Sequence, residues 1–283
     1  MTVVTEPGVY QLDEAEYHRD PVPGGSLSFS GAKRLLPPGC PALFHHERQH
    51  GRGNRQTFDF GHAAHSLVLG VGAPLAVIDA DDYRKKAAQE ARDAAYAIGE
   101  VPILASEHER VVAMAAAIKV HPVASRLFDP ARGKPEQSLF RRHPSGTMLR
   151  SRVDWLPDST PNGRMVLPDY KTCASAEPSA VEKAMANYAY HQQAAWYSDM
   201  VTGLGLAEDV TFVLVFQEKT APYLVTVAEP DSEALAIGRA LNNKAIELYA
   251  DCVKRDRWPG YTDDIELISL PPWATYVHDL DVA

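Results

Sequence analysis

The stretch MLRSRVDWLPDSTPNGRMVLPDYK, residues 148–171, decides the fold of this 283-residue chain. Its two ends, 148–156 and 164–171, are short runs in which apolar and polar residues alternate, a pattern typical of half-buried β-strands. The segment between them is dense in Pro, Asp, Asn and Gly, which favour turns. The stretch therefore predicts two strands joined by a turn.

Alternation along these strands gathers charged residues on one face. The first run places Arg150, Arg152 and Asp154 on the same face, and the second places Asp169 and Lys171 together. Arginines on the face of an acidic cluster are candidates for contacts with phosphate groups. One of them could instead form an ion pair with an acid of the chain itself.

The turn sets which residues face each other. A symmetric hairpin centred on residues 161–162 pairs residues whose numbers sum to 323, so it places Asp154 opposite Asp169 with Cβ atoms about 4.5–5.5 Å apart. Two facing carboxylates repel each other unless a cation lies between them, and aspartate oxygens select Mg²⁺ or Mn²⁺. Lys171 would then point at a scissile phosphate or its attacking water. The alternative is a surface hairpin with ordinary Asp and Lys residues, because registers slip easily by one residue.

The remaining patterns predict a mixed sheet flanked by helices, with helices added at the N-terminus. We expect one domain, with an arm and short helices over 1–60, a core over 61–256 and a tail over 257–283. Residues 1–25 read as an irregular arm, and the strand run 136–142 joins the two strands above in a three-strand meander. The other expected strands are 209–217 and 223–229, and the longer expected helices are 61–69, 81–98, 106–119, 178–201 and 231–254.

The charge of the chain is unevenly distributed. Twenty-eight basic and 37 acidic residues give a formal net charge of −9, which is a poor overall charge for a protein that binds a polyanion. Between residues 131 and 152 the balance reverses, with one acid, Glu136, and six basic residues: Arg132, Lys134, Arg141, Arg142, Arg150 and Arg152. An anion bound along one groove would account for this reversal, and a solvated face without a partner accounts for it equally well.

Five motifs, in chain order, resemble the PD-(D/E)xK nuclease superfamily, and within it the RecE-like exonucleases (exodeoxyribonuclease VIII, RecB-type) that are common in phages. The motifs are GHAAHSLVL (61–69), PEQSLF (135–140), the strand carrying Asp154, DYKT (169–172) and NYAYHQQAAWY (187–197). The likeness spans residues 61–200. Val153 stands before Asp154, where the superfamily pattern has proline.

The resemblance implies a restriction-endonuclease-like α/β core, with a mixed central sheet flanked by helices and an added helical N-terminal region. It implies an enzyme dependent on Mg²⁺, or on Mn²⁺, that hydrolyses double-stranded DNA from its ends, 5′→3′, and releases mononucleotides. Such enzymes form toroidal oligomers and work beside a single-strand annealing protein in phage-type recombination. We therefore expect DNA ends, a homo-oligomeric ring and an annealing protein as partners.

The resemblance also assigns roles to single residues. Lys171 orients the nucleophilic water and stabilises charge on the phosphate. The metal ligands that the resemblance implies are Asp154, Asp169, His65, Glu136 and the backbone carbonyl of Tyr170. The residues expected to contact or position DNA are Arg141, Arg142, Arg150, Arg152, Tyr190, Gln193 and Tyr197. Taken alone, His65 would be a packed histidine and the residues of 190–197 would be packing against the sheet.

Two other functions stay open. An endonuclease of the same superfamily would carry the same catalytic motif, and a non-catalytic DNA-binding module could share the fold. The second would be expected to lack an Asp or the Lys, and all three are present here.

Composition excludes several other classes of protein. No apolar run reaches the roughly 18 residues needed to cross a membrane, and no secretory signal is visible, so we expect a cytoplasmic protein of a bacterium or an infected host cell. Three scattered cysteines, Cys40, Cys173 and Cys252, exclude a disulfide framework and a four-cysteine iron–sulfur site.

Overall fold

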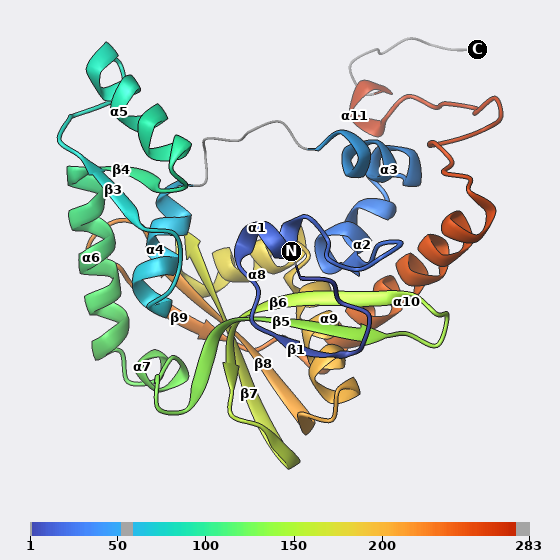
Figure 1. The fold of residues 1–283 in the computed structure, drawn as a ribbon. Helices are drawn as coiled ribbons and strands as arrows, with labels where there is room; N and C mark the ends of the chain where they lie inside the picture. The colour runs from blue at the N-terminus through green and yellow to red at the C-terminus, as the bar shows by residue number, and fades with distance from the viewer. Residues whose placement is uncertain (1, 52–58, 276–283) are drawn as a thin grey trace.

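The computed structural model describes residues 2–51 and 59–275, and within these ranges three β-sheets are flanked by helices (Figure 1). The strands are β1 (Gly8–Tyr10), β2 (Leu27–Ser28), β3 (Leu75–Ile78), β4 (Val101–Leu104), β5 (Gly133–Arg142), β6 (Met148–Pro157), β7 (Thr160–Cys173), β8 (Ala207–Glu218) and β9 (Val225–Ala228). The helices are α1 (Glu14–His18), α2 (Phe29–Leu35), α3 (Pro41–His50), α4 (Asp59–Leu69), α5 (Lys86–Ala97), α6 (Ala105–Val120), α7 (Ala124–Leu127), α8 (Pro178–Asn187), α9 (Tyr190–Gly203), α10 (Ser232–Arg255) and α11 (Pro272–Thr275). The predicted class, a mixed α/β fold with helices around a mixed sheet, is confirmed.

Strands β5 and β6 form an antiparallel hairpin at the centre of a four-stranded sheet. Paired residues have numbers that sum to 290, as in Arg142–Met148 and Gln137–Val153. The turn contains Gly146 with a φ of 87°, a backbone conformation that glycine adopts without steric cost. β1 adds antiparallel to β5, and β2 adds parallel to β6. This hairpin is the platform on which the acidic residues are mounted.

The N-terminal residues are ordered on this hairpin, and the prediction of an irregular arm over residues 1–25 is corrected. Within residues 2–25 the chain forms β1 and α1, and Asp13 caps α1 by accepting a hydrogen bond of 2.6 Å from the Glu16 N–H. Apolar side chains of the arm pack on β5 and β6 in a small cluster of Val4, Leu12, Tyr17, Val22, Phe140 and Met148. Burial of this apolar surface outweighs the Pro and Gly content that suggested irregular structure.

The predicted pairing of residues 148–156 with 164–171 is wrong. β6 pairs with β5, whereas β7 pairs parallel with β8 in a separate sheet completed by the antiparallel strand β9. No ladder joins β6 to β7 among the residues that the structure describes. The three-strand meander is therefore a hairpin followed by the first strand of a second sheet.

Pro168 offers a physical reason for this pairing. A proline lacks the N–H that a ladder needs, so it is tolerated where one side of a strand is left unpaired. β7 is the edge of its sheet, and Pro168 pairs in register with Val213 of β8. Backbone N–H groups of residues two apart point to the same side of a strand. The N–H of Tyr170 therefore points where the missing N–H of Pro168 would, away from β8.

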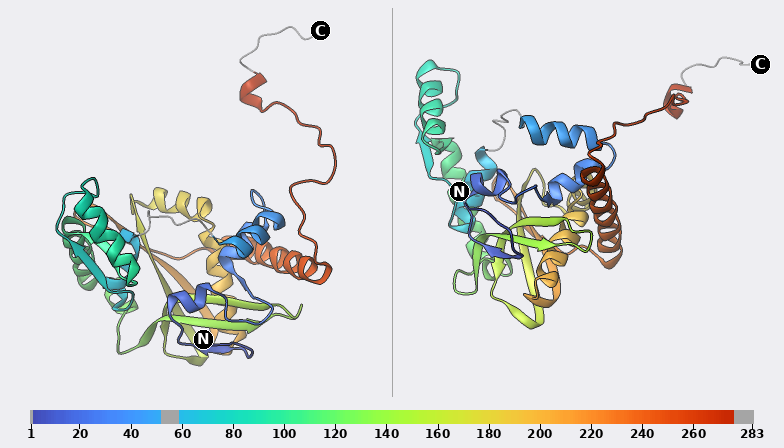
Figure 2. Two further views of the ribbon diagram at one scale, coloured as in Figure 1. Left: turned by 45° about the horizontal axis from the view of Figure 1, so that its top comes forward. Right: turned by 45° about the vertical axis from the view of Figure 1, so that its right-hand side comes forward.

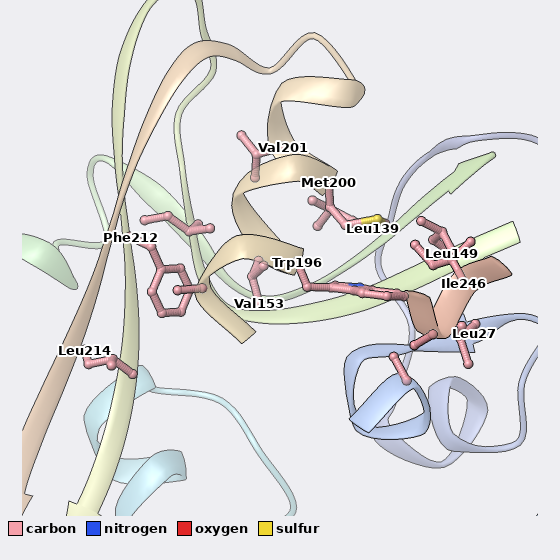
Figure 3. Packing of buried hydrophobic residues seen from close by; sticks show 14 of the residues in the cluster. Leu27, Leu139, Leu149, Val153, Trp196, Met200, Val201, Phe212, Leu214 and Ile246 are labelled. Atoms are coloured by element: carbon pink, nitrogen blue, oxygen red, sulfur yellow. The ribbon is translucent and has the colours of Figure 1, made fainter. Parts of the chain in front are cut away.

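One hydrophobic core joins the two larger sheets through α9 (Figure 3). Trp196 and Met200 of α9 belong to the same cluster as Val153 of β6 and Phe212 of β8, and Val153 lies between Phe212 and Trp196 (Figure 3). The expected single helix over 178–201 is broken here into α8 and α9, because Ala189 adopts a left-handed φ of 58° between them. The break ends the first helix and sets the polar face of α9 against β7.

Two parts of the chain lie away from this core. The short parallel pair β3–β4, which the sequence analysis did not predict, joins α5 and α6 into a lobe at one side of the molecule (Figure 2). Beyond α10 the chain runs away from the body toward α11, and side chains such as Ile265 and Leu267 are exposed there. The division of the chain at residues 60 and 256 remains a prediction, and residues 276–283 of the expected tail lie outside the described residues. None of the helices in the described ranges has the length and apolarity to cross a membrane.

Candidate metal centre

Three predicted ligands meet at the junction of α4, β5 and β6. His65 comes from α4, Glu136 from β5 and Asp154 from β6, and one ligand atom from each lies within 4.8 Å of the others. His65 Nδ1 is 3.7 Å from Asp154 Oδ2. The ring of His65 is also held edge-to-face against Tyr170 at 5.1 Å. One imidazole and two carboxylates in this arrangement are a donor set for a divalent cation.

Facing acids do occur on a hairpin, but they are Glu136 and Asp154. Pro135 pairs with Trp155 and Gln137 pairs with Val153, so Glu136 stands opposite Asp154. Glu136 adopts a left-handed φ of 52°, which costs a non-glycine residue on the order of 1 kcal/mol. The carboxylate of Glu136 forms an ion pair with Arg152. The predicted opposition of Asp154 and Asp169 across a hairpin is therefore wrong, and the acid opposite Asp154 is Glu136.

A further acid, Asp169 of β7, lies next to the cluster of His65, Glu136 and Asp154. Asp169 is buried, and its Oδ1 accepts a hydrogen bond of 2.8 Å from the Gln193 side chain of α9. Its Oδ2 forms an ion pair with Lys171. The ammonium of Lys171 lies 5.5 Å from the centre of the Tyr190 ring. Asp169 and Lys171 thus share one face of β7, as the sequence predicts.

A contact between Asp154 and Tyr170 connects the metal cluster to the Asp169–Lys171 pair. The N–H of Tyr170 donates a hydrogen bond of 2.7 Å to Asp154 Oδ2. The N–H and C=O of one residue in a strand point to the same side, so the Tyr170 carbonyl faces β6 as well. The Asp154 carboxylate therefore sits beside the Asp169–Lys171 pair without a ladder between β6 and β7.

Burial sets the charge states of the site. It raises the pKa of Asp154 to about 6, with the neighbouring Glu136 carboxylate acting in the same direction. It also raises the pKa of Asp169 to about 6, and the Asp154 carboxylate adds to this effect. Burial and the Lys171 cation lower the pKa of His65 to about 4. His65 is consequently neutral at pH 7, the state in which an imidazole ligates a metal.

Lys171 is a cation in this setting. Burial disfavours its charge, but the carboxylates of Asp169 and Asp154 outweigh burial and raise the pKa of Lys171 above its ordinary value. A protonated lysine cannot act as a general base. It can donate hydrogen bonds and stabilise negative charge on a neighbouring group.

A cavity of about 340 Å³ opens onto the first cluster. Its acidic lining consists of Glu136, Asp154 and a third acid, Glu14 of α1. Two histidines that the sequence analysis missed also line the cavity: His18 of α1, and His62, one turn before His65 on α4. The spacing of three residues between His62 and His65 was a signal for a shared face. Nothing in the sequence placed α1 over the site.

The residues predicted to contact DNA divide into a set near the site, described here, and a pair of arginines at the far end of the β5–β6 hairpin. Tyr197 lines the cavity, Gln193 binds Asp169, and Tyr190 packs over Lys171. Arg152 lines the cavity, while Arg150 forms an ion pair with Asp20 at 2.5 Å. The sequence left open that one of these two arginines pairs with an acid, and in the structure both do, Arg150 with Asp20 and Arg152 with Glu136.

Arg141 and Arg142 lie at the far end of the hairpin. They are five and six residues beyond Glu136 on β5, which corresponds to about 17–20 Å along a strand. Arg141 donates to the carbonyl of Asp199 at 2.8 Å, and Arg142 to that of Thr5 at 3.2 Å. The structure does not bring these two arginines to the metal cluster.

Comparison with known proteins agrees with this fold. A family described as a PDDEXK-like domain of unknown function (DUF3799) matches residues 28–271. A crystal structure of a "Putative exonuclease" from Eubacterium rectale is similar over 96% of this chain and 100% of that chain, with a TM-score of 0.60 and 13% sequence identity. At that identity the likeness is one of fold. No curated protein matches the chain.

Proposed function

Because this chain belongs to the family of PDDEXK-like domains of unknown function, we propose that it is a divalent-metal-dependent deoxyribonuclease that degrades double-stranded DNA from its ends. The observation that carries the proposal is the convergence of His65, Glu136 and Asp154 within 4.8 Å, beside the ion pair of Asp169 and Lys171. An acidic metal pocket next to a fixed cation suits the hydrolysis of a phosphodiester bond.

The donor set fits Mg²⁺ or Mn²⁺. Around an octahedral ion with ligands at about 2.1 Å, neighbouring ligand atoms lie about 3.0 Å apart and opposite ones about 4.2 Å apart. Ligand atoms that lie within 4.8 Å of one another would therefore close in by at most about 2 Å on binding. His65, Glu136 and Asp154 would hold the ion, with the Tyr170 carbonyl and Asp169 beside them. Once bound, a divalent cation lowers the pKa of a coordinated water and neutralises charge on the phosphate.

The chain's own residues supply positioning. Lys171, kept protonated by Asp169 and Asp154, would donate to the attacking water or to a phosphate oxygen. Gln193 fixes the Asp169 carboxylate through its hydrogen bond of 2.8 Å, and so holds the partner of Lys171. His65, neutral at pH 7, would keep its place as a ligand without competing for a proton.

The size of the cavity supports action at DNA ends. Small-molecule pockets span about 300–1,000 Å³, and 340 Å³ lies at the lower limit, which is room for about one nucleotide. α1 and residues 71–73 form part of its wall. A strand terminus enters such a cavity more readily than the interior of a duplex. The 5′→3′ direction and mononucleotide release rest on the RecE-like motifs.

A digest of two substrates tests the proposal. Linear duplex labelled at the 5′ end and covalently closed circular duplex are each incubated with the protein in Mg²⁺ or Mn²⁺, with EDTA as control. We expect early release of the 5′-labelled mononucleotide from the linear substrate and an intact circle. Cleavage of the circle would identify an endonuclease instead, and binding without any metal-dependent hydrolysis would identify a non-catalytic module.

The assembly and cellular role are proposed on the same resemblance. We propose a ring of identical subunits around DNA, acting in the cytoplasm with a single-strand annealing protein during phage-type recombination. Light scattering coupled to gel filtration measures the first directly. A monomeric mass with full exonuclease activity would contradict the ring.

A further inference from the structure

A second hollow, of about 680 Å³, adjoins the metal cavity. Both are lined by Tyr17 and His18 of α1 and by Ser28 and Ser30 at the start of α2. The two spaces are therefore neighbours that share part of their walls at α1 and α2. We refer to this second space as the arginine hollow.

The two spaces differ in charge. Among the described residues, the metal cavity is lined by three carboxylates and one arginine. The arginine hollow is lined by two carboxylates, Asp20 and Glu47, and by four arginines: Arg19, Arg34, Arg48 and Arg150. Counted over the described part of the chain, its formal balance is thus +2, in a protein whose net charge is −9. Acidic residues therefore line the cavity where a cation would bind, and basic residues line the hollow next to it.

Two of the arginines that line the hollow are fixed by contacts with other side chains. Arg48 donates to the Tyr249 hydroxyl at 2.7 Å and pairs with Asp20 at 3.1 Å. A Cβ on Gly25 would overlap the Arg48 guanidinium, so the glycine leaves room for that group. Arg34 pairs with Glu47. These pairs hold the guanidinium groups in place before a ligand arrives.

Other lining groups suit a sugar–phosphate backbone. The hydroxyls of Ser26, Ser28 and Ser30 line the hollow, and hydroxyl and guanidinium groups are common partners of phosphate oxygens. Arg19 is exposed at the end of α1, and no ion pair or hydrogen bond of its side chain is found within the described ranges. It is therefore the arginine whose charge is least compensated.

The position of the hollow fits a strand that continues from the metal site. Arg150 lies four residues before Asp154 on the same face of β6, about 13 Å along the strand. A duplex whose axis ran along β6 would advance by roughly four base pairs over this distance, at a rise of about 3.4 Å per base pair. The hollow therefore lies within reach of the phosphates that follow the one at the metal.

We propose that the arginine hollow binds the sugar–phosphate backbone of the DNA strand next to the nucleotide in the metal cavity. This inference rests on the proposed function. It adds Arg19 and Arg34, together with the serine hydroxyls, to the DNA-binding surface and assigns no role there to Arg141 or Arg142. The bound class is a polynucleotide backbone, read through its phosphates without regard to base.

The test separates binding from hydrolysis. Affinity for a fluorescein-labelled 30-base-pair duplex is measured by anisotropy in EDTA at several salt concentrations, for the wild type and for Arg19→Ala, Arg34→Ala and the double variant. Loss of two phosphate contacts should reduce the slope of log K against log salt by about 1.4–1.8. In Mg²⁺ the same variants should raise KM for the duplex and leave kcat near the wild-type value.

Arg84→Ala is the matched control. Arg84 is an exposed arginine that pairs with an acid, Asp82, and it lines neither space. Arg34→Lys keeps the charge and should retain most of the salt slope. Thermal unfolding checks that Arg34→Ala does not act through loss of its Glu47 partner.

Each outcome has one meaning. An active wild type with unchanged affinity and salt slope in the double variant would overturn the role of the hollow and leave the nuclease intact. A wild type that binds DNA with the expected slope but hydrolyses nothing in Mg²⁺ or Mn²⁺ would overturn the proposed function alone. Equal losses in Arg84→Ala and the double variant would reduce the effect to net charge and also overturn the inference.

Discussion

The Asp154 carboxylate accepts a hydrogen bond of 2.7 Å from the backbone N–H of Tyr170, and this contact links two sheets that share no ladder at that point. β6 brings Asp154 from one sheet, and β7 brings Tyr170 from the other. Asp154 is therefore both a candidate metal ligand and a structural acceptor. Substitutions at this position can separate the two roles.

Asp154→Asn should keep the fold and lose activity. The amide oxygen can still accept from Tyr170, but the residue no longer carries the charge that a divalent cation needs. Asp154→Ala also leaves the Tyr170 N–H without its acceptor, which costs about 1–3 kcal/mol of unfolding free energy. Urea unfolding and nucleotide release measured on both variants check this. Wild-type hydrolysis by Asp154→Asn would remove Asp154 from the metal site.

Metal affinity should fall in acid. The pKa values of Asp154 and Asp169 are raised to about 6, so protons compete with the cation below pH 6. Each carboxylate that must lose a proton should weaken apparent affinity about tenfold per pH unit below that point. The pKa of His65 is lowered to about 4, so His65 does not compete in this range.

Titration calorimetry with Mn²⁺ between pH 5.0 and 7.5 measures this dependence. Asp154→Asn is the control, since it should bind weakly at every pH. A constant affinity over that range would show that neither carboxylate with a raised pKa takes part in binding.

Lys171 and Asp169 should behave as a coupled pair. Lys171→Met leaves the buried Asp169 carboxylate without its cation, which costs about 3–5 kcal/mol. The double variant Asp169→Asn with Lys171→Met removes both charges and should recover most of the stability while staying inactive. A double-mutant cycle in urea gives the coupling, and additive effects of the two substitutions would contradict a direct pair.

The alternation of side chains along the strands predicted much of this site from the sequence. It put Asp169 and Lys171 on one face and Arg152 on the face of Asp154, and all three lie at the site. The pairing of strands failed, because alternation within a strand does not say which strand lies beside it. Pro168 was the overlooked signal, since it marks a strand with one unpaired side.

Long-range contacts account for the rest. Tertiary packing determines the left-handed φ of Glu136 and the position of α1 at the wall of the cavity. No local sequence pattern specifies either feature. Arg150 shows the same limit. Its face was predicted from the sequence, but its partner, Asp20, is 130 residues away along the chain.

Tyr170→Phe should destabilise the protein while preserving the metal ligands. The Tyr170 hydroxyl donates a hydrogen bond of 2.6 Å to Gln217 Oε1 in the buried core, and the Gln217 amide donates to the carbonyl of Met114 in α6. Removing the hydroxyl leaves a buried acceptor unpaired, which costs about 1–3 kcal/mol.

Tyr188→Phe is the matched control, because the Tyr188 side chain is exposed and should lose only a few tenths of a kcal/mol. Since Tyr170 still donates its N–H to Asp154, Mn²⁺ affinity at pH 7.5 should stay within about threefold of the wild type. Equal urea midpoints for the two variants would show that the hydroxyl of Tyr170 does not anchor β7 to the core. A large loss of Mn²⁺ affinity in Tyr170→Phe would instead show that this bond sets the position of the ligands.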